Sequence, residues 1–264
     1  MSTPAVRTAE LRTIRYRGAW ALAAREMRRV LGLWTQTILP SIVTAVLFLA
    51  VFGGALGGAL HNVAGVPYVR FILPGLLVMT VVVQAFANSS TSLFQAKNEG
   101  YIEDLLTSPL RPSDIALAYP TGGLVRGWLA ALAITLVAAP FAGPPRHPAV
   151  LAAALVLSGV VFSTLGLITG IWADTFDQHA FIANLVITPL ALGGVFYPAD
   201  RLSEPWSTLT RLDPLYYLVD AARYGAAGIH ESDVALSLFV AALLAGLTFV
   251  AARAVLASGW RLRP

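Results

Sequence analysis

The stretch AVLAAALVLSGVVFSTLGLITGIW, Ala149 to Trp172, contains no charged residue. A helix needs about 20 consecutive apolar residues to cross the hydrocarbon core of a bilayer, so this stretch is long enough to span a membrane. A strand of a membrane β-barrel would instead alternate in polarity over about ten residues, and this run is continuous. The stretch therefore predicts a membrane-spanning helix.

The composition of the whole chain agrees with this prediction. Of its 264 residues, 57% are hydrophobic and 12% are charged, and the mean hydropathy is +0.71. Soluble domains carry about 25% charged residues. The chain has no cysteine, which excludes disulfides, thiolate chemistry, iron–sulfur clusters and cysteine-based zinc sites. We expect an all-α integral membrane protein.

Five further apolar runs have the length of a membrane span. They are Ile38–Leu60, Phe71–Phe94, Leu117–Phe141, Ala180–Tyr197 and Val234–Leu256. Arg126 interrupts one of these runs, and Arg253 lies near the end of another, where a long side chain can reach the interface. The pattern predicts about six transmembrane helices. We expect residues 1–36 to form a cytoplasmic tail and an interface helix, 37–256 the transmembrane domain, and 257–264 a cytoplasmic tail.

The cations predict the orientation of these spans. With six spans both termini lie on one side of the membrane, together with the loops after the second and fourth spans. That side collects most of the Lys and Arg residues. Cytoplasmic loops of membrane proteins carry an excess of these residues. We therefore expect a multi-pass protein of the cell (inner, or cytoplasmic) membrane with both termini in the cytoplasm.

The segment before the first span has helical periodicity. Its apolar residues recur at alternating steps of four and three, namely Trp20, Ala24, Met27, Leu31 and Trp34. Arg25, Arg28 and Arg29 fall largely on the other side. This pattern is typical of an amphipathic helix that lies in the cytoplasmic interface of the bilayer. A helix that simply continues into the first span is the alternative.

The segment before the last span, residues 197–233, is expected on the outer side. It is too apolar for a solvated loop, because it contains Trp206, Leu209, Leu212, Leu215, Tyr216, Tyr217, Leu218 and Tyr224. We expect two short helices, interrupted by proline, that dip into the outer leaflet as re-entrant helices and bury these side chains against protein. A plain surface loop is the alternative.

One span carries a stripe of polar side chains. Gln84, Asn88, Thr91 and Gln95 follow at steps of four, three and four, so they share one helix face, with Ser92 beside it. Polar side chains in a bilayer need partners or water. The stripe therefore faces protein or a cavity. A substrate path and a helix-packing role remain equally open.

Several chemistries lack a sequence signal. No GxxxxGK[ST] phosphate-binding motif occurs, so the chain is not expected to bind ATP by a P-loop. The four histidines stand far apart, without paired carboxylates or a Ser-His-Asp arrangement. We expect no catalytic, cofactor or metal site, and no enzyme activity. Ionisable residues inside spans default to functional candidates. Arg126 is nearly the only one, and its alternative role is to reach the interface.

A second polar feature lies between two apolar runs, in the stretch NEGYIEDLLTSPLRPSDI, Asn98 to Ile115. Asn98 is suited to cap the N-terminus of a short helix, whose early turns would hold Glu99, Glu103 and Asp104. The helix macrodipole favours negative charge there. Glu99 and Glu103 are four residues apart, so we expect them to share one helix face.

This short helix also has an apolar side, formed by Ile102, Leu105 and Leu106. Pro109 is expected to end it, and Asp114 to help open the next helix. A short amphipathic helix in a cytoplasmic loop is a docking surface for another protein. A solvated loop that follows ordinary capping rules is the alternative.

The stretch resembles the coupling segment of type-2 ABC exporter permeases, the class of daunorubicin-type drug exporters and nodulation-type oligosaccharide exporters. The family pattern is met by Glu99, Gly100, Glu103, Leu105, Leu106, Pro109, Leu110, Asp114 and Ile115, although Glu99 and Gly100 lack the residue that usually separates them. A second match follows in ITPLALGGVFYPADRLSEPW and LDPLYYLVDAARYG. Its counterparts are Pro189, Gly193, Gly194, Tyr197, Pro198, Pro205, Trp206, Asp213, Pro214, Leu215, Tyr217, Val219, Asp220 and Arg223.

The resemblance implies a transport subunit that exports a drug, a lipid or a polysaccharide-type substrate. It implies pairing with a second permease copy or a close paralogue, and with two copies of a separate ATP-binding subunit that holds ATP and Mg. The coupling segment would contact that ATPase, and the first, second and fifth spans would line the path. No nucleic-acid partner is expected. The alternative is an ATP-independent channel or secondary transporter, which would need buried charges or inverted repeats; neither is visible in the sequence.

Overall fold

The computed structural model describes residues 4–51, 62–63, 65–187 and 194–262 of the chain. Nearly all of this part is helical. Its elements, in chain order, are α1 (Pro4–Gly32), α2 (Trp34–Leu49), β1 (Asn62–Val63), β2 (Val66–Pro67), α3 (Tyr68–Asn98), α4 (Ile102–Thr107), α5 (Pro112–Ala118), α6 (Thr121–Ala142), α7 (Pro148–Trp172), α8 (Phe176–Phe181), the π-helix η2 (Ile182–Ile187), the 3₁₀-helix η3 (Ala199–Arg201), α10 (Trp206–Leu212), α11 (Pro214–Ala227) and α12 (Val234–Ser258). The two strands form an antiparallel hairpin.

Four helical stretches of the described residues are long and apolar enough to cross a membrane: α3, α5 with α6, α7 and α12. They contain the spans predicted at Phe71–Phe94, Leu117–Phe141, Ala149–Trp172 and Val234–Leu256. The bent pair α1 and α2 is a fifth candidate. The prediction of an all-α membrane protein is confirmed.

The two other predicted spans fall partly outside the described residues. The first, Ile38–Leu60, is helical as far as the structure describes it, and α2 begins earlier than expected, at Trp34. The second, Ala180–Tyr197, is occupied by the end of α8 and by η2 up to Ile187. As complete spans, both stay predictions.

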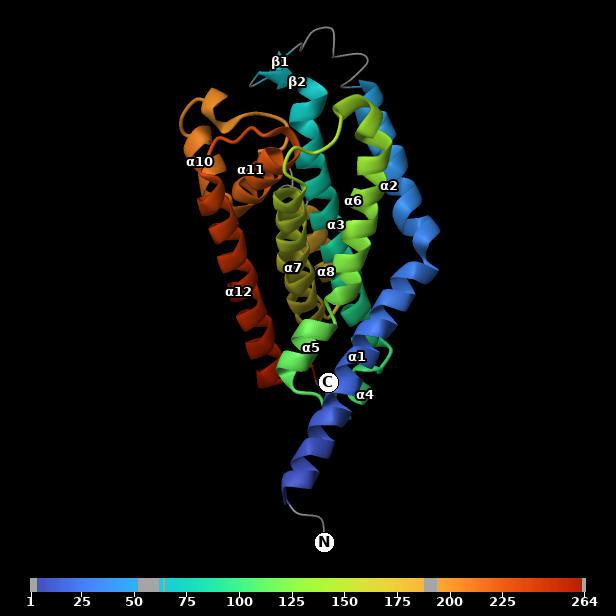
Figure 1. The fold of residues 1–264 in the computed structure, drawn as a ribbon. Coiled ribbons are helices and arrows are strands. Elements are labelled where there is room, and N and C mark those ends of the chain that lie inside the picture. The colour runs from blue at the N-terminus through green and yellow to red at the C-terminus, as the bar shows by residue number, and fades with distance from the viewer. Residues whose placement is uncertain (1–3, 52–61, 64, 188–193, 263–264) are drawn as a thin grey trace.

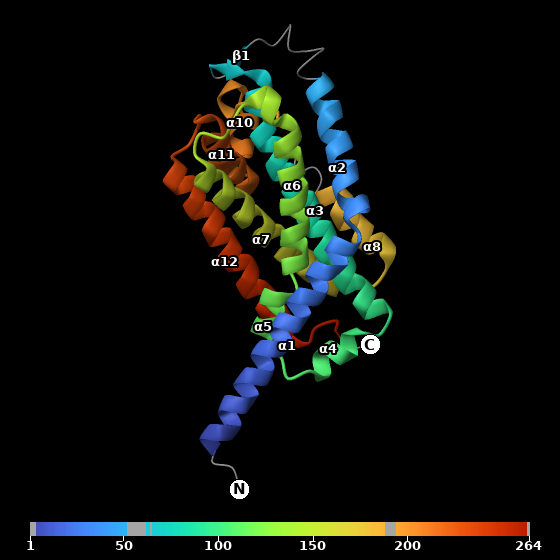
Figure 2. The ribbon, with the colours of Figure 1, turned by 45° about the vertical axis from the view of Figure 1, so that its right-hand side comes forward.

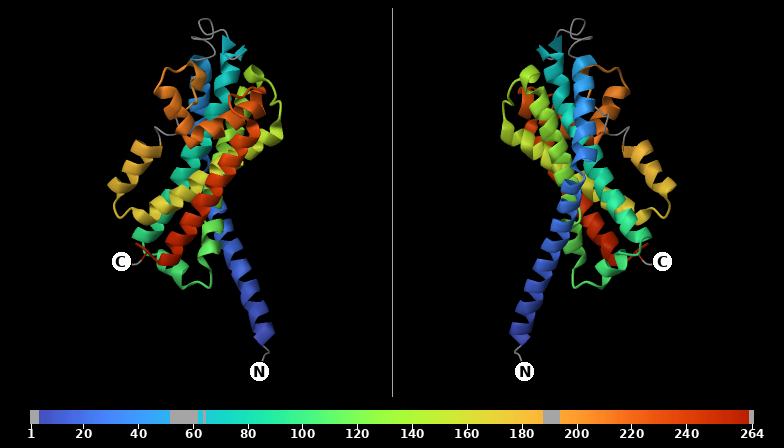
Figure 3. Two further views of the ribbon diagram at one scale, coloured as in Figure 1. Left: turned by 90° about the vertical axis from the view of Figure 1, so that its left-hand side faces the viewer. Right: turned by 90° about the vertical axis from the view of Figure 1, so that its right-hand side faces the viewer.

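Helix α1 does not continue straight into α2. The chain breaks at Leu33, and the two helices meet at an angle of 70°. Figure 1 shows α1 turning away from the bundle axis, and Figure 3 shows its first half projecting beyond the bundle. This geometry favours a separate helix over a simple continuation of the first span.

Helix α3 occupies the centre of the bundle and packs on α6, α7 and α11. The end of α12 and the projecting start of α1 lie at the end of the bundle that carries α4 and α5, which we call the α4 end. The hairpin, α10 and α11 lie at the opposite end, the hairpin end. One apolar cluster follows α3, α7 and α11, and a second joins α1, α4 and α5 at the α4 end.

The segment before α12 folds into the two short helices that were predicted, α10 and α11. Helix α11 is buried on α3, α7 and α12, and Leu215 and Leu218 are each 1% exposed. The burial predicted for α10 is wrong, because Trp206, Leu209 and Leu212 are 61%, 52% and 73% exposed. Helix α10 lies on the outside of the bundle and packs mainly on η3 and α11, its neighbours in the chain.

Two glycines allow α7 to approach α3 closely. A Cβ atom on Gly166 would lie 2.5 Å from the carbonyl oxygen of Phe86, and one on Gly170 would lie 2.7 Å from that of Ser90. Small residues four apart are a common means of bringing membrane helices together. The backbone contact between α3 and α7 therefore depends on these positions.

We expect Gly166→Ala to lower the free energy of unfolding by about 1–3 kcal/mol, because the added methyl group must push α7 away from the backbone of α3. Gly246→Ala in α12 is the matched control, since nothing lies within 4 Å of a Cβ there; it should be neutral or slightly stabilising. Thermal unfolding of the purified variants in detergent compares the two. Equal melting temperatures would contradict the close approach.

Candidate functional site

The coupling segment, residues 98–115, begins where α3 ends. Asn98 is the last residue of α3, and Gly100, with φ of +81°, turns the chain into α4. The predicted cap at Asn98 is therefore wrong, because α3 extends through it. Glu99 precedes α4, so the prediction that it shares a helix face with Glu103 is also wrong. Glu103 and Asp104 lie in the first turn of α4, as expected.

The two sides of α4 differ. Ile102 is 4% exposed and packs, with Leu105, into the apolar cluster of the α4 end. Glu99, Glu103 and Asp104 are exposed and form no ion pair within the described residues. The segment therefore presents unpaired negative charge on α4 and just before it, and α4 is anchored by its opposite side.

The rest of the segment is fixed to the helices around it. Helix α4 ends at Thr107, and Pro109 follows, as predicted. The Asp114 carboxylate accepts a hydrogen bond from the Arg111 backbone at 3.0 Å and opens α5. It also pairs with Arg15 of α1 at 2.9 Å. This ion pair links helix α1 to the coupling segment.

A groove with a volume of about 600 Å³ runs beside α4. It is lined by Lys97, Asn98, Gly100, Ile102, Glu103, Asp174, Arg261 and Leu262. Asp174 pairs there with Lys97 at 2.6 Å and with Arg261 at 2.7 Å. The hydrogen bond from Lys97, with the charges of Lys97 and Arg261, holds the pKa of the Asp174 carboxyl below its ordinary value. This contact ties the end of α3 to the loop after α7 and to the chain after α12.

Behind the coupling segment lies a buried polar cluster that we call the Glu26 network: Arg25, Glu26, Arg29, Asn88, Ser92 and Tyr119. Glu26 is 1% exposed. Its carboxylate pairs with Arg25 and Arg29, at 3.0 Å each, and accepts a hydrogen bond from the Ser92 hydroxyl at 2.9 Å. The network therefore joins α1 to the polar face of α3.

Two further contacts complete the network. The Ser92 hydroxyl lies 3.2 Å from the hydroxyl of Tyr119, which is fully buried between α5 and α6. Arg29 donates to the side-chain oxygen of Asn88 at 3.2 Å. Figure 2 shows α1 crossing the ends of α5 and α6 at this level. One carboxylate thus connects three helical segments.

The sequence reasoning missed Glu26. The periodicity places Arg29 on the side of α1 opposite the apolar stripe, and on that side its guanidinium contacts Glu26 and Asn88. The spacing of Leu22, Glu26 and Val30 could have revealed this acid. Glu26 lies four residues from each of two apolar residues, and both of these are buried. An acid on the apolar face of a helix requires a buried partner.

The residues of the polar stripe of α3 lie in different surroundings. Asn88 is 2% exposed and belongs to the Glu26 network, whereas Gln84 donates a hydrogen bond to Ser41 of α2 at 3.1 Å. Thr91 is partly exposed and Gln95 is exposed. The stripe is therefore divided between a packed interior, a cavity and an open surface.

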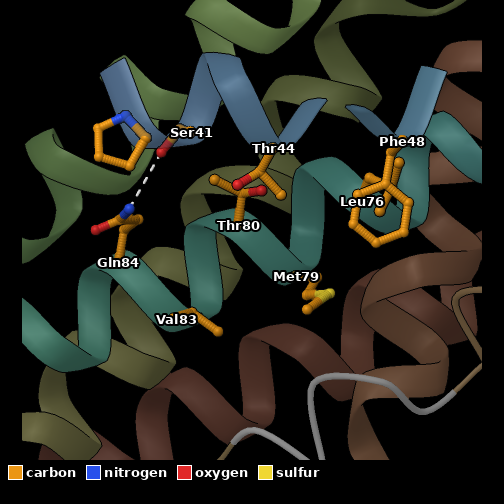
Figure 4. Close-up of a pocket in the computed structure, with 9 residues that line it drawn as sticks. Ser41, Thr44, Phe48, Leu76, Met79, Thr80, Val83 and Gln84 are labelled. Atoms are coloured by element: carbon orange, nitrogen blue, oxygen red, sulfur yellow. Dashed lines mark hydrogen bonds between the residues drawn. The ribbon is translucent and has the colours of Figure 1, made fainter. Parts of the chain in front are cut away.

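The cavity beside Gln84 lies between α2 and α3 and has a volume of about 180 Å³. Figure 4 shows the side chains of both helices around it and the hydrogen bond between Ser41 and Gln84. Its lining residues are Pro40, Ser41, Thr44, Phe48, Leu76, Met79, Thr80, Val83 and Gln84. The lining is mostly apolar, with hydroxyl and amide groups at intervals.

At the hairpin end, Arg223 of α11 is buried and fully engaged at its terminal nitrogens. It donates to the backbone oxygens of Gly194 and Val195, pairs with Glu231 at 3.2 Å and stacks 4.0 Å from the ring of Phe71. This places one residue of the second family motif at the junction of α3, α11 and the loop before α12.

The other residues of that motif shape the same region. Asp220 accepts hydrogen bonds from the backbone of Glu231, at 2.7 Å, and from Ser237. Asp213 caps α11, of which Pro214 is the first residue, by accepting from Leu215. Pro198 precedes η3, Trp206 begins α10, and Tyr217 contacts Tyr216 edge-on. These contacts hold the segment in place.

Comparison with known proteins relates this architecture to one family. Residues 17–226 match the family model described as ABC-2 type transporter. The inner membrane transport permease YadH of Escherichia coli K12 is 37% identical over 210 residues, which cover 79% of this chain and 82% of that protein. Nodulation protein J of Neorhizobium galegae is 26% identical over 223 residues, 83% of this chain and 85% of that protein.

We expect Glu26→Gln to lower the free energy of unfolding by about 1–3 kcal/mol, because the positive charge of Arg29 loses its partner. A fully buried pair would cost about 3–5 kcal/mol, but the Arg29 side chain is 31% exposed. Arg25→Gln is the matched control, since Arg25 is 57% exposed; it should cost less than about 1 kcal/mol. Denaturation in detergent measures both, and equal losses would contradict a buried network.

Proposed function

The chain belongs to the ABC-2 type transporter family and is a transmembrane transport subunit, and we propose that ATP hydrolysis on a separate subunit drives it as an exporter. It carries a drug, a lipid or a polysaccharide-type substrate out of the cytoplasm. The family implies an ABC ATP-binding partner and a multi-pass position in the inner membrane. We propose two copies of that partner and a second permease copy, identical or closely related.

The observation that carries this proposal is the unpaired negative charge of the coupling segment. Asp114, Asp174 and Glu26 all have cationic partners within the chain. Glu99 and Glu103 have none in the described residues and lie on the surface. Exposed acids on and beside an anchored helix suit cations or backbone donors of a soluble protein, which we assign to the ATPase. We therefore propose that the α4 end faces the cytoplasm, and that both termini lie on that side.

The contacts behind α4 supply a route for movement. A push on α4 and α5 reaches α1 through the pair of Arg15 and Asp114. It reaches α3 through Glu26 and Ser92, which are 2.9 Å apart. Closure of the ATPase pair would therefore shift α1 and α3 together, and not α4 alone.

We assign the substrate path to the face of α3 that bears Gln84. The cavity between α2 and α3 has apolar walls and a few hydroxyl and amide groups, which suit a substrate with apolar and polar parts. Leu39, Val43 and Leu47 on α2 are exposed. A second permease copy that covers this face would enclose a path between the two subunits.

We expect Glu99→Lys together with Glu103→Lys to uncouple export from ATP hydrolysis, because positive charge would repel the cations that meet these acids. Glu99→Gln with Glu103→Gln removes the charge without repulsion and should weaken docking modestly, by about 0–1 kcal/mol for each exposed pair. Permease abundance, co-purified ATPase and export are measured in the same cells. Normal abundance is expected, because both residues are exposed and outside the spans.

Normal export by the double lysine variant would show that α4 does not contact the ATPase. Export that persists when the ATPase partner is absent would instead favour an ATP-independent channel or secondary transporter. The two results are distinguishable, because the first leaves ATP dependence in place.

We expect Gln84→Leu to change the transport rate or the substrate preference while assembly stays normal, because Gln84 lines the cavity. Asn88→Leu on the same face should instead lower stability, because it removes the partner of Arg29. Export and thermal unfolding of both variants separate the two effects. Loss of assembly by Gln84→Leu would assign this position to helix packing.

A further inference from the structure

Arg126 is a cation inside a membrane-spanning stretch without an anionic partner. It lies in the second turn of α6, within the span Pro112–Ala142. Its side chain is partly buried, its Nε atom is buried without a hydrogen-bond partner, and no ion pair or hydrogen bond involves it within the described residues. A charge at membrane depth is costly unless it is paired or reaches the interface.

A second arginine near Arg126 adds to the positive charge that lacks an anionic partner in the described residues. Helix α1 packs on α6, and Gly122 of α6 lies against Glu26 of α1. Arg126 follows Gly122 by four residues and Arg29 follows Glu26 by three, so both arginines lie on the facing sides of these two helices. The Nε atom of Arg29 is also buried and unpartnered. Glu26 is already shared between Arg25, Arg29 and the Ser92 hydroxyl. This corner of the molecule holds more guanidinium groups than carboxylates.

The corner lies at the bend between α1 and α2. Arg29 is in the last turn of α1, and the chain breaks at Leu33 and turns by 70°. Gly122, one turn before Arg126, is so close to α1 that a Cβ atom on it would meet Glu26 at 3.0 Å. Trp34, the first residue of α2, is 57% exposed. Exposed tryptophans are enriched at the level of the lipid headgroups.

We propose that Arg29 and Arg126 form a binding site for the phosphate group of an anionic phospholipid, in the leaflet at the α4 end. Arginine presents a planar fork of N–H donors that matches phosphate oxygens, and such contacts are stronger than neutral hydrogen bonds. A lipid phosphate would neutralise the charge that the described residues leave unbalanced. The site does not depend on the transport function proposed above.

A bound lipid at this bend would have a structural consequence. Its phosphate would join the end of α1, through Arg29, to the second turn of α6, through Arg126. The 70° bend would then be stabilised by a group that the chain itself does not supply.

The test uses the purified full-length protein in detergent, titrated with dioleoylphosphatidylglycerol or with dioleoylphosphatidylcholine. Bound lipid is counted by native mass spectrometry, and thermal unfolding is followed in parallel. We expect saturable retention of the anionic lipid and a higher melting temperature with it than with the zwitterionic one. Arg126→Gln should weaken the anionic lipid about tenfold or more, the loss expected for a charge-assisted contact.

Arg28→Gln is the matched control, because Arg28 is exposed on the same helix as Arg29 and its loss changes the net charge equally. It should change anionic-lipid affinity less than about twofold, since an exposed charge contributes little. Equal losses from Arg28→Gln and Arg126→Gln would reduce the effect to general surface charge and overturn the site.

Two further measurements complete the test. If Arg126→Gln fails to fold, Arg126→Lys keeps the charge without the planar fork and should show intermediate affinity; unchanged affinity would overturn a guanidinium site. Inorganic phosphate, titrated at the same concentrations, separates the two sources of phosphate. Stabilisation by inorganic phosphate equal to that by the anionic lipid would overturn the lipid assignment. So would wild-type protein that retains both lipids equally.

Discussion

The buried carboxylate of Glu26 is the contact on which the α4 end of the structure depends. It lies at the junction of α1, α3 and the start of α6, and it is 1% exposed. A buried carboxylate is tolerated only when it is paired and hydrogen-bonded. Arg29 and Ser92 meet that demand from two different helices. The requirement to satisfy one charge therefore fixes how α1 sits against α3.

Much of the fold could be predicted from the sequence, because apolar length is a strong physical constraint in a bilayer. The runs at Phe71–Phe94 and Ala149–Trp172 each lie within a single helix. The ends of the helices, and the side that each helix turns toward the rest of the protein, were harder to predict. Helix α3 extends to Asn98, because nothing before Gly100 turns the chain. The exposed position of Trp206 depends on the tertiary packing of α10, which its apolar character does not reveal.

The candidate site, too, could be predicted only in part from the sequence. The sequence identified the acids of the coupling segment and the cap at Asp114, because capping chemistry is local. It did not identify Glu26, since an acid between two arginines looks like an exposed ion pair unless the buried face of the helix is known. Periodicity distinguishes two faces, but which of them meets protein is decided by helices far apart in the chain.

The two ends of the bundle use charge in opposite ways. At the hairpin end, Arg223 is buried and its terminal nitrogens contact Glu231 and two backbone oxygens. Its charge is therefore satisfied by contacts within the protein. At the α4 end, Glu99 and Glu103 on the surface and Arg126 in α6 have no ion-pair partner among the residues that the structure describes. A charge without a partner in the described residues can still gain free energy by pairing with a group on another molecule. We therefore propose that the α4 end is completed by other molecules, by protein at the coupling segment and by lipid at the bend.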